Sequence, residues 1–166
     1  MITVGYVRAM ADYNQWQNEN LYGAADRLTD AQRREPRGAF FGSTHATLNH
    51  LLWADQIWMS RFAGTPRPRA PGIPESVGMI ESWDDLKRER AAFDRAILDW
   101  AGRVDQGRLE GDLTWFSGAT GRQLSKPKWL LITHMFSHQT HHRGQVHCLL
   151  TQCGVKPGGT DLAFRP

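Results

Sequence analysis

The chain has 166 residues, of which 40% are hydrophobic and seven are tryptophan, so it can form one domain with a substantial core but is short for two. Its twenty basic and seventeen acidic residues give a formal net charge of +3, and they are interspersed in stretches such as DDLKRERAAFDR (84–95), as on a solvated helix face rather than a nucleic-acid-binding surface. No segment reaches the ~20 apolar residues of a membrane span, and the opening MITVGYVRAMADYNQWQ lacks the apolar core of a signal peptide. We therefore expect a single cytoplasmic domain over residues 1–166.

Four segments show helical periodicity, and residues that favour helix ends mark their limits. Ser43 suits the N-cap of the second helix, and Ser82 with Asp85 suits the start of the third. Pro127 fits the first turn of the fourth helix, because proline has a fixed φ. The expected helices run from about Thr3 to Leu28, from Ser43 to Gly64, from Ser82 to Val104 and from about Pro127 to Gly154. This pattern predicts an all-α four-helix bundle.

The connections between these helices differ in length and composition. The first, of about a dozen residues, has a possible short helical turn at DAQRR. The second, residues 63–81, contains four of the eight prolines, so we expect it to be extended and poorly helical. Stretched at ~3.3 Å per residue it outreaches a helix of ~30 Å, which allows a long crossover and a parallel third helix. The last connection places SGATG between DLTWF and RQLS, which indicates a small hairpin or an ordered loop.

Five of the seven histidines lie in HMFSHQTHHRGQVH, residues 134–147, inside the fourth helix. At about 100° per residue, His138 and His142 fall within the apolar stripe of that helix. His134 and His141 lie at one edge of the stripe, and His147 points to the opposite side. Burying two neutral imidazoles one turn apart costs a few kcal/mol unless their nitrogens find partners. A divalent metal is one such partner, because an i, i+4 histidine pair presents two nitrogens to one point.

A third ligand for this pair has to come from another helix, and the candidates are His45 and His50. His50 lies in the middle of the amphipathic segment TLNHLLWADQIW, whereas His45 lies in the first turn, where exposure is expected. We therefore favour His50. Two other metal chemistries are excluded: no glutamate has a histidine three residues later, as a di-iron carboxylate bundle needs, and Gln139 replaces the glutamate of a zincin motif.

Three stretches resemble the DinB superfamily, also called DinB/YfiT-like metalloenzymes: NHLLWADQIW, HMFSHQTHHRGQVHCLL and GVKPGGTDL. The resemblance extends over essentially the whole chain. It implies a four-helix bundle of up-down-down-up connectivity, usually a homodimer, with one divalent metal ion per chain, most often zinc or nickel. By motif, the ligands it implies are His50, His138 and His142. Relatives include transferases and isomerases that use low-molecular-weight thiols.

Three protein nitrogens leave at least one coordination position open, as in catalytic zinc sites. We therefore expect a metal-dependent enzyme that activates either a thiol, as a transferase or isomerase does, or water, as a hydrolase does, for reaction with a small-molecule substrate. The alternative is a non-catalytic metal-binding stress-response dimer. We expect no membrane partner. We also expect no nucleic-acid partner, because the sequence contains no recognised DNA-reading element.

Several neighbours of the histidines have a structural and a functional interpretation. Gly144 costs ~1 kcal/mol relative to alanine within a helix and suggests close approach of another helix or of a dimer partner. Arg143 is expected to be structural, and Gln145 either packs or orients a ligand. His134 and His141 are expected at a partly exposed edge. The aromatic residues expected in the core or at an interface are Trp53, Trp58 and Trp115.

Overall fold

The computed structural model describes residues 1–165, and the protein is mostly helical, at 62%. The helices and strands in chain order are α1 (Val4–Ala25), α2 (Asp30–Arg34), α3 (Thr44–Phe62), α4 (Ile73–Ser76), α5 (Trp83–Arg103), a 3-10 turn (Gln106–Leu109), β1 (Asp112–Ser117), β2 (Arg122–Pro127), α6 (Lys128–Gln152) and a second 3-10 turn (Leu162–Phe164). Within the described residues, no helix combines the length and the apolarity that a membrane crossing requires.

Three of the four long helices, α1, α3 and α5, begin at side-chain caps that the sequence contains, whereas α6 follows Pro127 without one. Thr3, Ser43 and Ser82 each accept a hydrogen bond through the side-chain oxygen from the backbone N–H three residues later, at 3.1, 3.2 and 3.3 Å. Each cap satisfies one of the N–H groups that a helix start leaves unpaired. The expected N-caps at Ser43 and Ser82 are thus confirmed.

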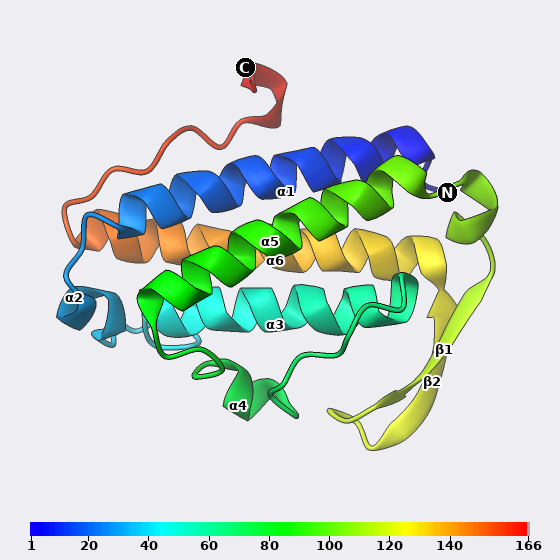
Figure 1. Cartoon of the computed structure of the whole chain (residues 1–166), viewed down its shortest axis with the longest axis horizontal. Coiled ribbons are helices and arrows are strands. Elements are labelled where there is room, and N and C mark those ends of the chain that lie inside the picture. The colour runs from blue at the N-terminus through cyan, green and yellow to red at the C-terminus, as the bar shows by residue number, and fades with distance from the viewer. Residues whose placement is uncertain (166) are drawn as a thin grey trace.

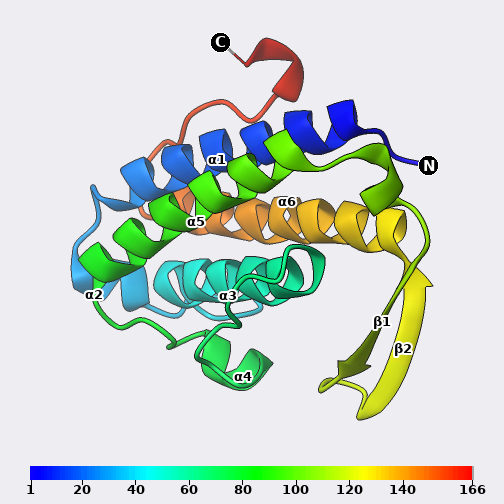
Figure 2. The same cartoon turned by 45° about the vertical axis from the view of Figure 1, so that its right-hand side comes forward.

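The four long helices pack side by side in pairs (Figures 1 and 2). α1 contacts α5 and α6, and α3 contacts the same two helices. α1 and α6 run in one direction, while α3 and α5 run in the other, because the linker between α3 and α5 crosses back along the length of the molecule (Figure 1). The C-terminal segment returns along α1, where the Tyr13 hydroxyl donates to the Thr160 carbonyl at 2.7 Å.

The prediction of an all-α four-helix bundle is wrong. The described residues form six α-helices and a two-stranded antiparallel sheet. β1 and β2 pair from Asp112↔Pro127 to Ser117↔Arg122, and Gly121 in the turn has φ +65°, a conformation that glycine adopts without steric cost. The hairpin lies where the sequence indicated a hairpin or an ordered loop. The fold is therefore mostly helical with a small antiparallel sheet.

The two additional helices are short and locally capped. At α2, Thr29 and Gln32 form a reciprocal capping box, in the segment where a helical turn was expected. α4 lies in the linker that was expected to be extended; proline occupies its first turn, where a missing N–H costs no hydrogen bond. Four prolines therefore did not prevent a helical turn there.

A buried polar network crosses the core and receives side chains from all four long helices. The Arg90 guanidinium on α5 pairs with Asp55 of α3 at 2.9 Å and with Asp94 of α5 at 2.8 Å, and all three side chains are at most 3% exposed. Asn18 of α1 donates to Asp94 at 2.9 Å, and Gln139 of α6 donates to Asp55 at 2.6 Å. The network joins helices that apolar packing alone would leave free to slide, because each bond has a defined direction and length.

Replacing Arg90 by leucine should reduce the free energy of unfolding by about 3–5 kcal/mol, because two buried carboxylates would lose their counter-charge. The matched control is Arg88→Leu, two residues away on the same helix, where the arginine is 70% exposed and pairs with Asp85 at the surface. That change should cost less than about 1 kcal/mol. Urea unfolding of both variants measures the difference, and equal losses would contradict a structural role for the buried network.

Candidate metal centre

Three imidazoles converge where α3 packs against α6. His50 comes from α3, and His138 and His142 come from successive turns of α6. The ring centroids of His138 and His142 are 4.5 Å apart, and His50 lies 5.2 Å from the first and 5.3 Å from the second. One ring nitrogen from each residue lies within 4.8 Å of the other two. The structure thus brings together the three histidines that the sequence and the family resemblance indicated.

Hydrogen bonds determine which nitrogen of His50 faces its neighbours. The Ser76 hydroxyl donates to the Ile73 carbonyl at 2.6 Å, so its oxygen is left to accept from the Nδ1–H of His50 at 2.9 Å. With the proton on Nδ1, the Nε2 of His50 carries a lone pair. A hydrogen-bond acceptor for the other ring N–H is the usual arrangement around metal-binding imidazoles, and the Ser76 oxygen provides one here.

His142 is oriented in the same way by its own helix. Its Nδ1 lies 2.7 Å from the Oε1 of Gln145, one turn later, and the amide group of Gln145 faces His141 at 3.5 Å. The amide oxygen accepts only, so Nδ1 carries the proton and Nε2 carries the lone pair. Of the two interpretations open for Gln145, orientation of a ligand has a direct hydrogen bond in its support.

The arrangement of lone pairs fits a cation. The Nε2 atoms of His50 and His138 are 3.3 Å apart, so a proton or a metal ion has to lie between them to prevent repulsion of their lone pairs. A set of three imidazoles without a carboxylate is suited to zinc, nickel and other late divalent metals. The donor chemistry of this cluster therefore fits the metal that the family resemblance implied.

Burial keeps the imidazoles neutral. His50 and His142 are 3% and 7% exposed, and His138 is half-buried. Burial lowers the pKa of His50 to about 4, and burial together with the neighbouring histidines lowers the pKa of His138 to about 3. Burial also lowers the pKa of His142. All three rings are therefore in the metal-binding form at neutral pH, since a protonated imidazole has no lone pair to offer.

A cavity of about 750 Å³ lies against the cluster. Its walls come from α3, from the linker that contains α4, from the β1–β2 hairpin and from the segment before α3. In Figures 1 and 2, α4 and the hairpin flank the same face of α3. The lining residues that carry aromatic rings are Phe40, Phe41, Trp53, Trp58, Trp115 and Phe116. A ligand of substrate size can thus reach the histidines through a mostly apolar chamber.

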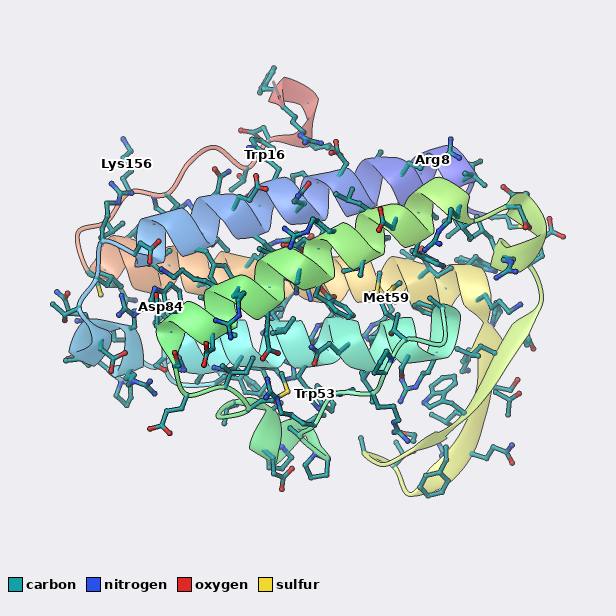
Figure 3. All side chains as sticks on the ribbon, viewed as in Figure 1. Arg8, Trp16, Trp53, Met59, Asp84 and Lys156 are labelled. Carbon is teal, nitrogen blue, oxygen red and sulfur yellow. The ribbon has the colours of Figure 1, made fainter. Side chains whose placement is uncertain are left out.

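The tryptophans were expected in the core or at an interface, and this is confirmed for Trp53, which is buried, and for Trp58, which packs against the core. These two residues and Trp115 also line the cavity, a role that the sequence did not indicate. Trp53 projects from α3 towards the linker, opposite to the buried Met59 (Figure 3), and its ring N–H donates to the Ala70 carbonyl at 2.9 Å. It therefore holds the linker at the cavity wall.

The remaining histidines lie outside the cluster. His45 is buried at 3% exposure, and its Nε2 lies 2.9 Å from the Ile80 carbonyl, so the expectation that it would be exposed was wrong. His134 lines the cavity one turn before His138, with ring centroids 5.7 Å apart. His141 is exposed, and His147 lines a separate cavity against α1.

Arg143 and Gly144 have contrasting surroundings. Arg143 is buried and donates to the side chain of Asn14 on α1, which supports the structural role expected for it. A Cβ built on Gly144 would meet nothing within 4 Å, so no helix among residues 1–165 approaches it closely.

Two contributors to the site carried no signal in the helical pattern. Ser76 lies in the linker that was expected to be extended, and the proline of GIPES, in a first-turn position, is the one local feature that could have indicated a helical turn there. Phe41 precedes the N-cap of α3 and packs against His50 with its ring tilted by 32° and the ring centroids 4.0 Å apart. Neither residue belongs to a periodic segment.

Known proteins resemble this chain over most of its length. A model described as the DinB family matches residues 1–166. Protein DinB of Bacillus subtilis (strain 168) is 23% identical over 159 residues, which cover 92% of this chain and 89% of that protein.

The metal-free protein should lose stability as the pH falls below 6.5. In the unfolded chain His50 and His138 take up protons near pH 6.5, whereas in the folded chain they stay neutral to about pH 4 and 3, so the unfolded state binds more protons throughout that window. Stability is therefore complete above pH 6.5 and declines on acidification. Urea unfolding in the presence of a chelator measures this slope, which should be shallower in His138→Gln; an unchanged slope would contradict the assigned shifts.

Proposed function

The chain belongs to the DinB family, and we propose that it binds one divalent metal ion, zinc or nickel, through His50, His138 and His142. The proposal is supported by the three imidazole nitrogens that lie within 4.8 Å of one another. It is supported further by the Ser76 and Gln145 hydrogen bonds, which direct lone pairs into the cluster. The nickel and zinc alternatives share this donor set, and cellular supply selects between them.

We propose further that the protein is a metal-dependent enzyme. The observation that carries this proposal is the cavity of about 750 Å³ that adjoins the histidines, because a purely structural metal site is closed by a fourth protein ligand and needs no access. A non-catalytic metal-binding protein would not need a cavity of this size beside its ligands. Three protein ligands leave a position for a water molecule or for a low-molecular-weight thiol.

The bound metal would lower the pKa of a coordinated water towards 7 or deprotonate a coordinated thiol. The chain's own residues provide the remaining functions. Phe41 and Trp53 pack beside His50 and exclude bulk water from that end of the cavity. His134 lies beside His138 and against Trp58, where its imidazole can accept or return a proton from a group in the cavity. The proposed reaction is thus transfer or isomerisation through a thiol, or hydrolysis by water, on a small molecule.

The homodimer implied by the family resemblance is also part of the proposal. Gly144 on α6 is exposed, with space for a second copy of the chain to approach, and a glycine at that position permits close helix contact.

Replacing His50, His138 or His142 by alanine should remove stoichiometric metal, because two imidazoles hold an ion far more weakly than three. The control is His147→Ala, on the same helix but lining a different cavity, which should retain one ion per chain. Elemental analysis of purified, tag-free variants gives the ratio. Full metal occupancy in any of the three cluster variants would contradict the ligand assignment.

Ser76→Ala provides an intermediate case. It removes the acceptor behind His50 but leaves all three imidazoles, so the ratio of one metal per chain should persist with an affinity about 10- to 100-fold weaker.

An exogenous thiol should reach the metal in the cobalt-substituted protein. Addition of 2-mercaptoethanol should produce a thiolate-to-cobalt absorption band, because a three-histidine site leaves a position for a further ligand. A spectrum that does not respond to thiol, azide or other small ligands would support the structural alternative instead. The apparent affinity of the folded protein should weaken only as the pH falls towards about 4, where protons begin to compete with the metal for His50.

A further inference from the structure

The cavity beside the histidines has a second polar end. Arg61, at the last turn of α3, and Arg67, in the following linker, both line it. The histidines and these arginines are the titratable side chains that line the cavity, and the walls between them are largely aromatic. Their separation along α3 makes this an elongated site with different chemistry at each end.

Arg61 is held in place by aromatic rings. Its guanidinium carbon lies 4.5 Å from the centroid of Trp58 and 5.5 Å from that of Trp115. Such stacking fixes the plane of the guanidinium while leaving its N–H groups available at the edge. Trp58 comes from α3 and Trp115 from β1, so the hairpin and the helix position this side chain together.

The positive charge of these arginines has no carboxylate partner in the part of the chain that the structure describes. Among residues 1–165, neither Arg61 nor Arg67 forms an ion pair with a carboxylate, whereas nearby Arg69 pairs with Glu89. No aspartate or glutamate of the described chain lines the cavity. Burial and the charge of Arg67 lower the pKa of Arg61, which means that the two guanidinium groups repel each other at this end of the cavity. An anion placed between them would remove that repulsion.

The dimensions of α3 set the length of a matching ligand. Trp58, on which Arg61 stacks, follows His50 by eight residues, which corresponds to ~12 Å along the helix at ~1.5 Å per residue. The space between them is lined by Ile57, Trp53 and Trp58. A flat apolar body of one or two rings would fill this distance and bury its faces against aromatic side chains.

We propose that the cavity binds an aromatic or similarly flat carboxylate, with its carboxylate on Arg61 and Arg67 and its other end at the histidine cluster. This inference rests on the proposed function, since it names the substrate class of the same site. A carboxylate is favoured because its two oxygens match the planar fork of a guanidinium. The aromatic walls select the body of the ligand, and the two arginines select its charged end.

Calorimetric titration with biphenyl-4-carboxylate and with the neutral biphenyl-4-carboxamide tests the proposal. The two ligands have nearly the same shape, so the carboxylate should bind about 10- to 100-fold more tightly only if a cationic end recognises its charge. Arg61→Gln and Arg67→Gln should each remove most of that preference without changing the affinity for the amide. Arg69→Gln, in the same linker but outside the cavity, should leave it intact.

The metal content of the same samples separates this inference from the proposed function. Titrations are made on metal-loaded and on chelator-stripped protein, with thermal melting to establish that each variant is folded; Arg61→Lys, which keeps the charge, should restore part of the preference. Equal affinity for acid and amide, no binding of the acid, or a preference that persists in both glutamine variants would overturn the inference while bound metal upholds the centre. A carboxylate preference in a protein that binds no metal would uphold the inference and overturn the metal centre.

Discussion

The buried ion pairs around Arg90 constrain the rest of the structure. Asp55, Arg90, Asp94, Asn18 and Gln139 lie in the core and link α1, α3, α5 and α6. A core of aliphatic side chains tolerates small shifts of one helix along another, whereas a buried charge without its partner is costly. The helices are therefore held in one register by groups that have few alternative arrangements.

This register brings the candidate metal ligands together. Gln139 donates to the Leu51 carbonyl at 2.9 Å as well as to Asp55, and these contacts join α6 to α3 at positions next to His138 and His50. The glutamine occupies the place of the catalytic glutamate in a zincin motif, yet it is fully buried and points into the core. Its role is to position the helix, and the neighbouring histidines then face each other on the opposite side.

The irregular segments make the site usable. The linker before α5 supplies Ser76 behind His50 and the Ala70 carbonyl that holds Trp53, and the β1–β2 hairpin supplies Trp115 beside Arg61. These segments are the parts of the chain that depart from a four-helix bundle. Rigid helices thus present the imidazoles, while loops and a small sheet form the chamber around them, a division of labour that is common in binding sites.

The sequence by itself determined the long helices and the cluster of histidines. Helix positions follow from local caps and a repeat of 3.6 residues, so Ser43, Ser82 and the i, i+4 pair His138 and His142 could be recognised without any knowledge of tertiary contacts. The same pattern separated His50 from His45, although it predicted the wrong environment for His45, which bonds to the Ile80 carbonyl in the core.

Only the tertiary structure decided what surrounds those histidines. The path of a proline-rich linker and the placement of a hairpin depend on contacts far apart in the sequence, and no periodic pattern records them. The hydrogen bond from His50 to Ser76 spans 26 residues, and the stacking of Arg61 on Trp115 joins a helix to a strand. The candidate ligands could therefore be predicted from the periodicity of single helices, whereas the cavity and its charged end are formed only in the folded chain.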